Sequence, residues 1–195
     1  MNWTSDAATK ARITATLALV ALACLPTNIA FAAETVTVDN FVRAETDTTM
    51  KRYVSQGAFG KFLHIRGMTP IDKQDVIGMN RDTLYSAAVF DLTEPVTVTK
   101  PDPGKRFQSM MVVSEDHSIP PVRHGPGAFT LTRQQVGTRY AMVLFRTFAD
   151  PNDPVSMQAA RALQDRIEVR QASPGKFQVP DRLRILATAQ SVNPA

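Results

Sequence analysis

Several polar side chains gather at the start of one predicted buried strand, and their types suit the binding of a small polar ligand. They are Asp72, Asn80, Arg81, Asp82, Tyr85 and Ser86. An arginine binds a carboxylate through two parallel hydrogen bonds, so Arg81 could hold an acidic ligand that Asn80 and Tyr85 orient. The alternative is structural: Arg81 would pair with an aspartate of this group or with Asp75, and Asn80 would cap a turn.

A second polar group follows a later predicted strand. Glu115, Asp116 and His117 end that strand, and His124 lies in the same loop. Histidine and carboxylate side chains are zinc ligands, so a metal site here is conceivable. The chain has only three histidines, however, and solvated loop residues are the simpler interpretation. The sequence therefore predicts no specific metal and requires no cofactor.

The two groups leave binding and catalysis open as functions. A serine triad would need Ser86 or Ser109 with His117 and an acid, but no Gly-x-Ser-x-Gly segment surrounds either serine. Asp82 and Glu115 are possible paired carboxylates for glycoside hydrolysis, although nothing singles them out. We therefore predict a module that binds a small ligand or a partner protein. The alternative is a hydrolytic enzyme that combines the first group with Glu115, Asp116 or His117.

The first 32 residues have the organisation of a signal peptide. A weakly basic stretch precedes an apolar run, Ile13–Leu25, which is too short for a bilayer core that needs about 20 residues. Ala30-Phe31-Ala32 then forms a small-x-small cleavage pattern. We predict cleavage near residue 32, export to the periplasm or extracellular space, and no stable membrane anchor afterwards; an uncleaved anchor is the alternative. Cleavage would also remove Cys24, the only cysteine.

Length and charge limit the number of domains and the classes of partner that the chain is expected to have. With 195 residues, the chain has room for one domain, predicted at 33–177, followed by a helical tail at 178–195. The formal net charge of +4 is mild. Because the arginines are scattered among acids rather than gathered into a basic stripe with interleaved aromatic residues, we predict no nucleic-acid partner.

Apolar periodicity predicts the elements and their order. It predicts strands at 84–92, 96–99, 107–114, 128–132, 139–148 and, as an edge strand, 168–172, with helices at 39–56, 154–167 and 181–190. Asp39 and Asp153 are the expected N-caps of the first two helices, with Pro154 opening the second. Strands joined by proline-rich turns favour antiparallel pairing. The predicted fold is mainly β with flanking helices (α+β), an antiparallel β-sandwich or jelly-roll-like arrangement.

Short motifs along this region carry a family resemblance. They are Thr69-Pro70-Ile71-Asp72, Asn80-Arg81-Asp82-Thr83-Leu84-Tyr85-Ser86, Gly104-Lys105-Arg106-Phe107, Glu115-Asp116-His117, Arg146-Thr147 and Leu163-Gln164. Together they resemble the bacterial domain-of-unknown-function 1254 family over about Asn40 to Ala172, and Asn80–Ser86 is the most specific motif. The resemblance implies an exported β-rich protein and no particular reaction, and we include Arg146 among the ligand-binding candidates.

The same resemblance bears on partners. Many members of this family carry a second β-sandwich domain after the first, and this chain stops before such a domain could fit. We therefore expect either a homo-oligomer or pairing with a separately encoded second β-sandwich domain.

Overall fold

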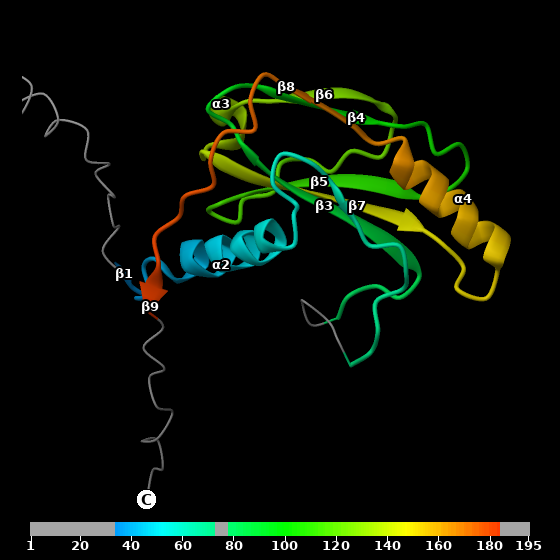
Figure 1. Cartoon of the computed structure of the whole chain (residues 1–195), viewed down its shortest axis with the longest axis horizontal. Helices are drawn as coiled ribbons and strands as arrows, with labels where there is room; N and C mark the ends of the chain where they lie inside the picture. The colour runs from blue at the N-terminus through cyan, green and yellow to red at the C-terminus, as the bar shows by residue number, and fades with distance from the viewer. Residues whose placement is uncertain (1–33, 73–77, 184–195) are drawn as a thin grey trace, which may run out of the picture. The chain divides into compact units, whose positions relative to one another are not determined.

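The computed structural model describes residues 34–72 and 78–183, and its central strand is β3 (Thr83–Asp91; Figure 1). All nine residues of β3 are buried. Because successive side chains of a strand point to opposite faces, burial of the whole strand requires a packed layer on each side. The strand predicted at 84–92 is confirmed to within one residue at each end.

β3 lies inside a four-stranded antiparallel sheet with the order β2-β3-β7-β5. Its other strands are β2 (Leu63–His64), β7 (Tyr140–Phe148) and β5 (Gln108–Ser114). β3 and β7 pair over their full length, from Thr83 opposite Phe148 to Asp91 opposite Tyr140. The two-residue strand β2 forms one edge of this sheet.

A second antiparallel sheet has three strands in the order β6-β4-β8. They are β6 (Gly127–Leu131), β4 (Val96–Lys100) and β8 (Glu168–Gln171), the last at the edge, as predicted. Buried side chains of both sheets form one hydrophobic cluster that includes Phe90, Phe145 and Val98, so the two sheets lie against each other (Figure 1). The mainly β class with flanking helices is confirmed.

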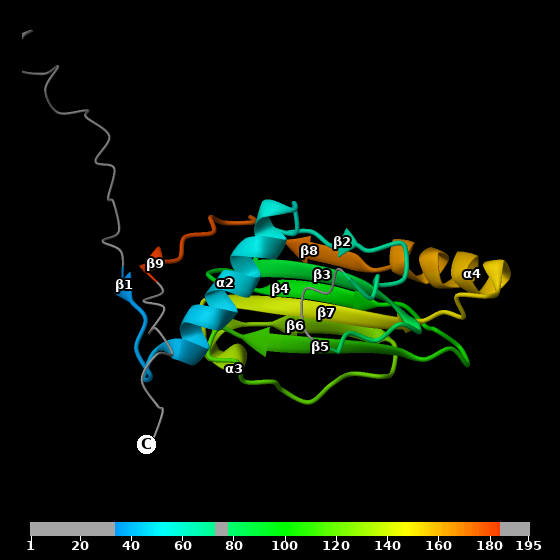
Figure 2. The ribbon, with the colours of Figure 1, turned by 90° about the horizontal axis from the view of Figure 1, so that it is seen from below.

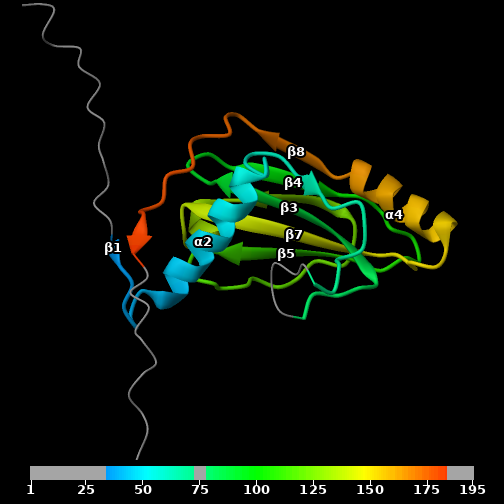
Figure 3. The same ribbon diagram turned by 60° about the horizontal axis from the view of Figure 1, so that its bottom comes forward.

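Helix α2 (Phe41–Ser55) lies across the other face of the four-stranded sheet, as Figures 2 and 3 show. Its buried Met50 and Tyr53 share a second hydrophobic cluster with Val89 of β3. The remaining short helix, α3 (Arg133–Val136), precedes β7. The central sheet is therefore covered by α2 on one face and by the smaller sheet on the other.

The caps of the two long helices follow the sequence to different degrees. Helix α4 (Pro154–Asp165) begins as predicted: the Asp153 carboxylate accepts a hydrogen bond from the Val155 amide at 2.9 Å. For α2, however, the predicted N-cap is wrong. Asn40, not Asp39, is the N-cap, and its side chain makes no capping hydrogen bond.

The segments near the two ends of the described chain pair with each other. β1 (Glu34–Thr35) and β9 (Arg182–Leu183) form a two-stranded parallel sheet. The helix predicted from residue 181 is therefore wrong at 182–183, where the backbone is a strand. The rest of that helix, the predicted signal peptide and Asp75 lie outside the described residues. Within residues 34–72 and 78–183, no helix is long and apolar enough to cross a membrane.

Asp91, the last residue of β3, is held by hydrogen bonds that set its acidity. Its side chain is 2% exposed, and its oxygens accept bonds from Nε (3.1 Å) and a terminal nitrogen (2.8 Å) of Arg139. Thr93 donates two more, through its amide and its hydroxyl. Burial by itself would raise the pKa of Asp91, but these hydrogen bonds outweigh it and lower the pKa from 3.8 to about 2.

We expect Asp91→Asn to remove part of the acid sensitivity of the fold. A carboxylate whose pKa is lowered in the folded state stabilises the protein above its unfolded pKa, near 3.9, and this contribution is lost as the pH falls toward 2. The shift is worth about 2 kcal/mol. Urea unfolding between about pH 6 and pH 2 should therefore show a smaller loss of stability for Asp91→Asn than for wild type. Equal losses would contradict the assignment, and the exposed neighbour variant Glu94→Gln should behave as wild type.

Candidate functional site

The candidate residues predicted from the sequence do not form one site, because β3 separates them. Tyr85 and Ser86 are consecutive in β3, so their side chains lie on opposite faces of the sheet. Tyr85 shares its face with Arg146, its partner on β7, and the Arg146 guanidinium lies 6.0 Å from the centre of the Phe107 ring. Ser86 faces the opposite side, where Gln164 of α4 contacts it.

Four predicted residues are exposed at the entrance of β3: Asp72, Asn80, Arg81 and Asp82. The backbone amide of Asn80 donates a hydrogen bond to the Tyr85 phenol oxygen at 2.9 Å, which orders this turn. Within the described part of the chain, Arg81 forms no ion pair with either aspartate of the group. The predicted pairing of Arg81 with these aspartates is therefore corrected, and Asp75 lies outside the described residues.

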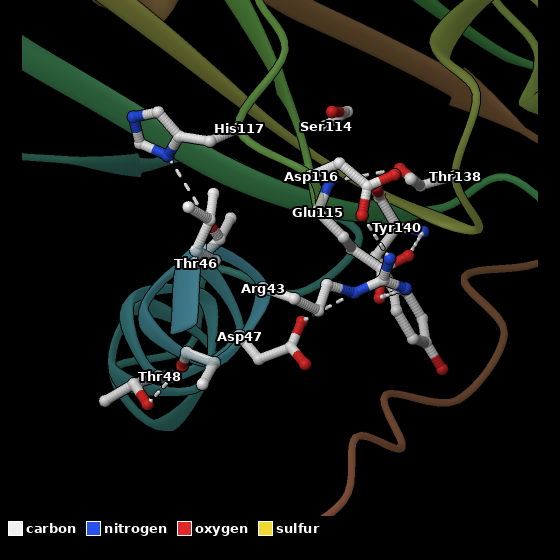
Figure 4. Close-up of polar contacts among 12 residues, drawn as sticks. Arg43, Thr46, Asp47, Thr48, Ser114, Glu115, Asp116, His117, Thr138 and Tyr140 are labelled. Carbon is white, nitrogen blue, oxygen red and sulfur yellow. Dashed lines mark hydrogen bonds and ion pairs between the residues drawn. The ribbon is translucent and has the colours of Figure 1, made fainter. Parts of the chain in front are cut away.

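A second predicted group, Glu115, Asp116 and His117, follows the far end of β5 (Figure 4). The backbone amide of Tyr140 donates a hydrogen bond to Glu115 Oε2 at 2.9 Å, so Glu115 lies beside the first residue of β7. Arg146 is six residues further along β7, which corresponds to about 20 Å of extended strand. The structure therefore corrects the prediction of a hydrolytic site that combines the β3 entrance with Glu115, Asp116 or His117.

Arg43 of α2 forms ion pairs with three carboxylates at this end of the sheet (Figure 4). Its guanidinium nitrogens lie 2.8 Å from Glu115 Oε1, 2.6 Å from Asp116 Oδ1 and 3.6 Å from Asp47 Oδ1. The side chains of Glu115 and Asp47 are each 4% exposed. Burial by itself would lower the pKa of Arg43, but the three carboxylates outweigh it and raise the pKa. The network ties α2 to the sheet.

The two histidines of the conceivable zinc site lie apart. His117 has a left-handed backbone (φ 60°), and its Nδ1 lies 3.1 Å from Thr46 Oγ1 of α2. His124 packs against the Phe107 ring, with 5.9 Å between ring centres, at the other end of β5. Among residues 34–72 and 78–183, no three histidine, cysteine, aspartate or glutamate side chains are grouped to hold a metal ion.

Ser86 belongs to a third group of polar side chains. Its other members, His64 and Gln164, are not among the site residues predicted from the sequence. His64 of β2 is the register partner of Ser86, and its Nδ1 lies 2.8 Å from Ser86 Oγ. Gln164 of α4 donates through Nε2 to Ser86 Oγ at 3.0 Å and to the backbone oxygen of Tyr85 at 2.9 Å. Ser86 and Gln164 are 0% exposed, so β2, β3 and α4 meet in a buried network that leads to His64.

This network determines which nitrogen of His64 carries the proton. The carbonyl oxygens of Tyr85 and Ile65 both face the Gln164 amide nitrogen, which fixes that nitrogen as the donor toward Ser86. The buried Ser86 hydroxyl accepts this bond, so its own proton needs an acceptor, and His64 Nδ1 is within reach. This pattern of hydrogen bonds therefore favours the tautomer of neutral His64 with its proton on Nε2.

The surroundings of His64 also favour its neutral form. Burial lowers the pKa of His64 below its usual 6.5, and the nearby positive charge of Arg66 lowers it further. Asp165 opposes both effects, but it forms an ion pair with Arg66, which partly cancels its charge. The lowered pKa and the hydrogen bonds together favour an uncharged imidazole with its N–H at Nε2, and Nε2 has no hydrogen-bond partner among the described residues.

His64 lines a cleft of about 500 Å³ between β2 and β8, the strands at one edge of each sheet. The lining residues are Gly60, Lys61, Phe62, His64, Ile167, Val169, Arg170 and Gln171. This volume lies in the range of about 300–1,000 Å³ that is typical of small-molecule sites. Lys61 and Arg170 are exposed, and the lining includes no aspartate or glutamate.

A second cleft, of about 360 Å³, lies beside Asp91 and Arg139. Its principal charged groups already satisfy each other through two hydrogen bonds. The chain segment that follows β8 forms part of its lining, and Tyr140 holds that segment by donating its phenol proton to the Lys176 carbonyl at 2.7 Å and accepting from the Gln178 amide at 2.9 Å. The cleft beside His64 is the better candidate site, since the charged side chains in its lining, Lys61 and Arg170, are not paired with each other or with an acid of the described residues.

Two antiparallel sheets with flanking helices, opened at one edge by a cleft, define the class of this protein. A family model described as "Protein of unknown function (DUF1254)" matches residues 59–171, more than half of the chain. The chain belongs to this family, as its motifs predict. The matched segment contains every residue that lines the cleft, together with Ser86 and Gln164.

A solved structure supports the fold. The chain is similar to the crystal structure of the VPA0106 protein from Vibrio parahaemolyticus, with 17% sequence identity and a TM-score of 0.51. The match covers 73% of this chain and 42% of VPA0106, so this chain spans less than half the length of that protein. At this identity the likeness concerns the fold alone. No curated protein matched the sequence.

Proposed function

We propose that this protein is a small-ligand-binding module and that its ligand occupies the cleft between β2 and β8. The observation that carries this proposal is the support of His64. Ser86 and Gln164 are fully buried, yet their hydrogen bonds serve to fix one imidazole at the wall of a cleft of about 500 Å³. A histidine held in one orientation and one tautomer is what specific recognition requires, since the position of its donor is then constant.

Hydrolysis through Ser86 is a weaker candidate for the same residues. The Ser86 side chain is 0% exposed and does not line the cleft, so a substrate carbonyl has no access to its oxygen. The hydrogen bond also reaches Nδ1 of His64, which leaves Nε2 for the cleft. Ser86 is therefore better described as a positioning residue for His64 than as a nucleophile.

The proposal is tested by screening ligands against the wild-type chain and against a variant in which a large side chain blocks the cleft. We expect compounds from a panel of sugars, amines, amides and carboxylates to raise the melting temperature of the full chain, because a ligand at 100 times its Kd adds about 2.7 kcal/mol of stability. Lys61→Trp, which places a large ring at the cleft, should abolish the shift. Lys105→Trp, at an exposed position in the turn between β4 and β5, should not. If no compound of the panel gave a melting-temperature shift that Lys61→Trp abolishes, the proposal would be overturned.

We also propose that the chain is exported and that its first 32 residues are removed. The apolar run and the small-x-small pattern at Ala30-Phe31-Ala32 support this proposal. N-terminal sequencing of the protein recovered from the periplasm or medium should begin at Ala33. Recovery of the uncut chain in membranes would contradict it.

We further propose that the chain binds a protein partner, which is either a second copy of the chain or a separately encoded β-sandwich domain. It is supported by the family resemblance, in which a second domain often follows the first. Light scattering of the purified chain should give a mass above that of a monomer, or a co-expressed second domain should copurify with it. A monomer that captures no such domain would count against both forms.

A further inference from the structure

We infer that the ligand of the cleft is a small organic acid, whose carboxylate is held by Lys61, Arg170 and the Nε2–H of His64 and whose apolar part lies against Phe62 and Val169. This inference rests on the proposed function, because it names the chemical class of ligand for the same cleft. Four features of the cleft carry it.

The first feature is the sign of the charge. The charged residues in the lining are Lys61 and Arg170, both cations. Neither side chain makes an ion pair or hydrogen bond with a described residue, so both side chains can bind an anion. Outside the lining, Arg66 and Asp165 form an ion pair with each other. The cleft therefore carries a net positive charge that favours an anion over a cation.

The second feature is the hydrogen-bond donor. Ser86 occupies Nδ1 of His64 at 2.8 Å, so the neutral imidazole directs its remaining N–H away from the buried network. A carboxylate is an acceptor at both oxygens and has no proton to offer at pH 7. It therefore matches a site made of an imidazole N–H, an ammonium and a guanidinium, all of which donate.

The third feature is the apolar wall. Phe62 packs edge-on against Phe90 and Phe145 of the core, with ring centres 5.8 Å and 5.3 Å apart, which fixes its position. Ile167 and Val169 complete an apolar surface beside it. An inorganic anion would leave this surface unused, whereas an acid with a ring or a short hydrocarbon chain would bury it.

The fourth feature is size. A volume of about 500 Å³ is of the size that accommodates a small molecule. Benzoate and hexanoate are suitable probes because each joins one carboxylate to a compact apolar group. Benzamide and hexanamide have nearly the same shape without the charge, so they isolate the contribution of the anion.

The binding should depend on pH in a defined direction. In the free protein Arg66 disfavours and Asp165 favours the protonated form of His64, and Lys61 and Arg170 lie in the same cleft lining, with Glu168 beside them on β8. A bound carboxylate favours the protonated imidazole, so affinity should rise as the pH falls through the pKa of His64. His64→Gln should bind more weakly and lose this dependence, because glutamine does not titrate.

The test is calorimetric titration of the full chain with the two acids and their two amides. We expect both acids to bind and both amides to bind at least about tenfold more weakly. Lys61→Gln and Arg170→Gln should each weaken acid binding about threefold to tenfold. Lys105→Gln and Arg133→Gln, which remove exposed cations that do not line the cleft, should leave it unchanged.

The outcomes separate this inference from the proposed function. Amides that bind as tightly as acids, or acids that bind equally to Lys61→Gln and Arg170→Gln, would overturn the acid assignment and leave a ligand-binding cleft in place. A failure of both acids to bind would also overturn it, whatever else the wider panel reveals. If, in addition, no compound of that panel were sensitive to Lys61→Trp, the proposed function would fail as well.

Discussion

Replacing Arg43 with methionine should lower the free energy of unfolding by about 2–4 kcal/mol. Arg43 is the cation that faces the carboxylates of Asp47 and Glu115, whose side chains are each 4% exposed. Removing one partner of a buried ion pair leaves an uncompensated charge, which costs about 3–5 kcal/mol. We expect the lower part of this range because the Arg43 side chain is 35% exposed and solvent screens part of the interaction.

A matched variant on the same helix controls for the loss of a positive charge. Lys51→Met removes a cation from α2 that pairs with Asp181 at 2.5 Å, but this pair is on the surface, with side chains 57% and 75% exposed. Its removal should leave urea unfolding nearly unchanged. If Arg43→Met were as stable as Lys51→Met, the network in Figure 4 would not hold α2 to the sheet.

Gln164→Leu should also destabilise the protein, by about 2–4 kcal/mol, and should disturb the cleft as well. Its amide nitrogen supplies hydrogen bonds to the Tyr85 carbonyl and to Ser86 Oγ, and the side chain is 0% exposed. A leucine of similar size keeps the packing but leaves these acceptors without a donor, at about 1–3 kcal/mol each. Chemical denaturation measures the stability, and ligand titration measures the second effect.

The exposed position 158 of the same helix offers the control. Gln158→Leu makes the same chemical change without removing a buried donor, so both stability and ligand affinity should stay close to wild type. Loss of stability without loss of affinity in Gln164→Leu would mean that Gln164 does not position His64. Unchanged stability would mean that the buried hydrogen bonds contribute little.

The fold was largely predictable because its strands carry local signals. The continuous apolar run of β3 predicts burial on both faces, and the alternation in β4 predicts burial on one. Asp153 and Pro154 likewise predict the start of α4. The strand at Arg182–Leu183 was not predictable in this way, because its partner, β1, lies almost the whole described chain away.

The candidate site was predicted less well, for a geometric reason. Residues that are adjacent in sequence point to opposite faces of β3, so Tyr85 and Ser86 do not share a site. Conversely, Ser86 meets His64, 22 residues earlier, and Gln164, 78 residues later. Nothing in the local pattern pairs these residues. His64 lies in a glycine-containing connector whose two-residue strand is too short to produce a periodic signal.

The measurement that tests the central claim most directly is the proton state of the His64 ring. Nitrogen–proton correlation spectra of the full chain should show three histidine side chains, and His64→Gln identifies the one in the cleft. We predict that at pH 7 His64 is neutral with its proton on Nε2, that Ser86→Ala removes this preference, and that benzoate shifts His64 while leaving His117 and His124 unchanged. The account would be contradicted if the His64 ring were charged at pH 7 or carried its proton on Nδ1. It would also be contradicted if the His64 signals did not shift with any compound that the protein binds.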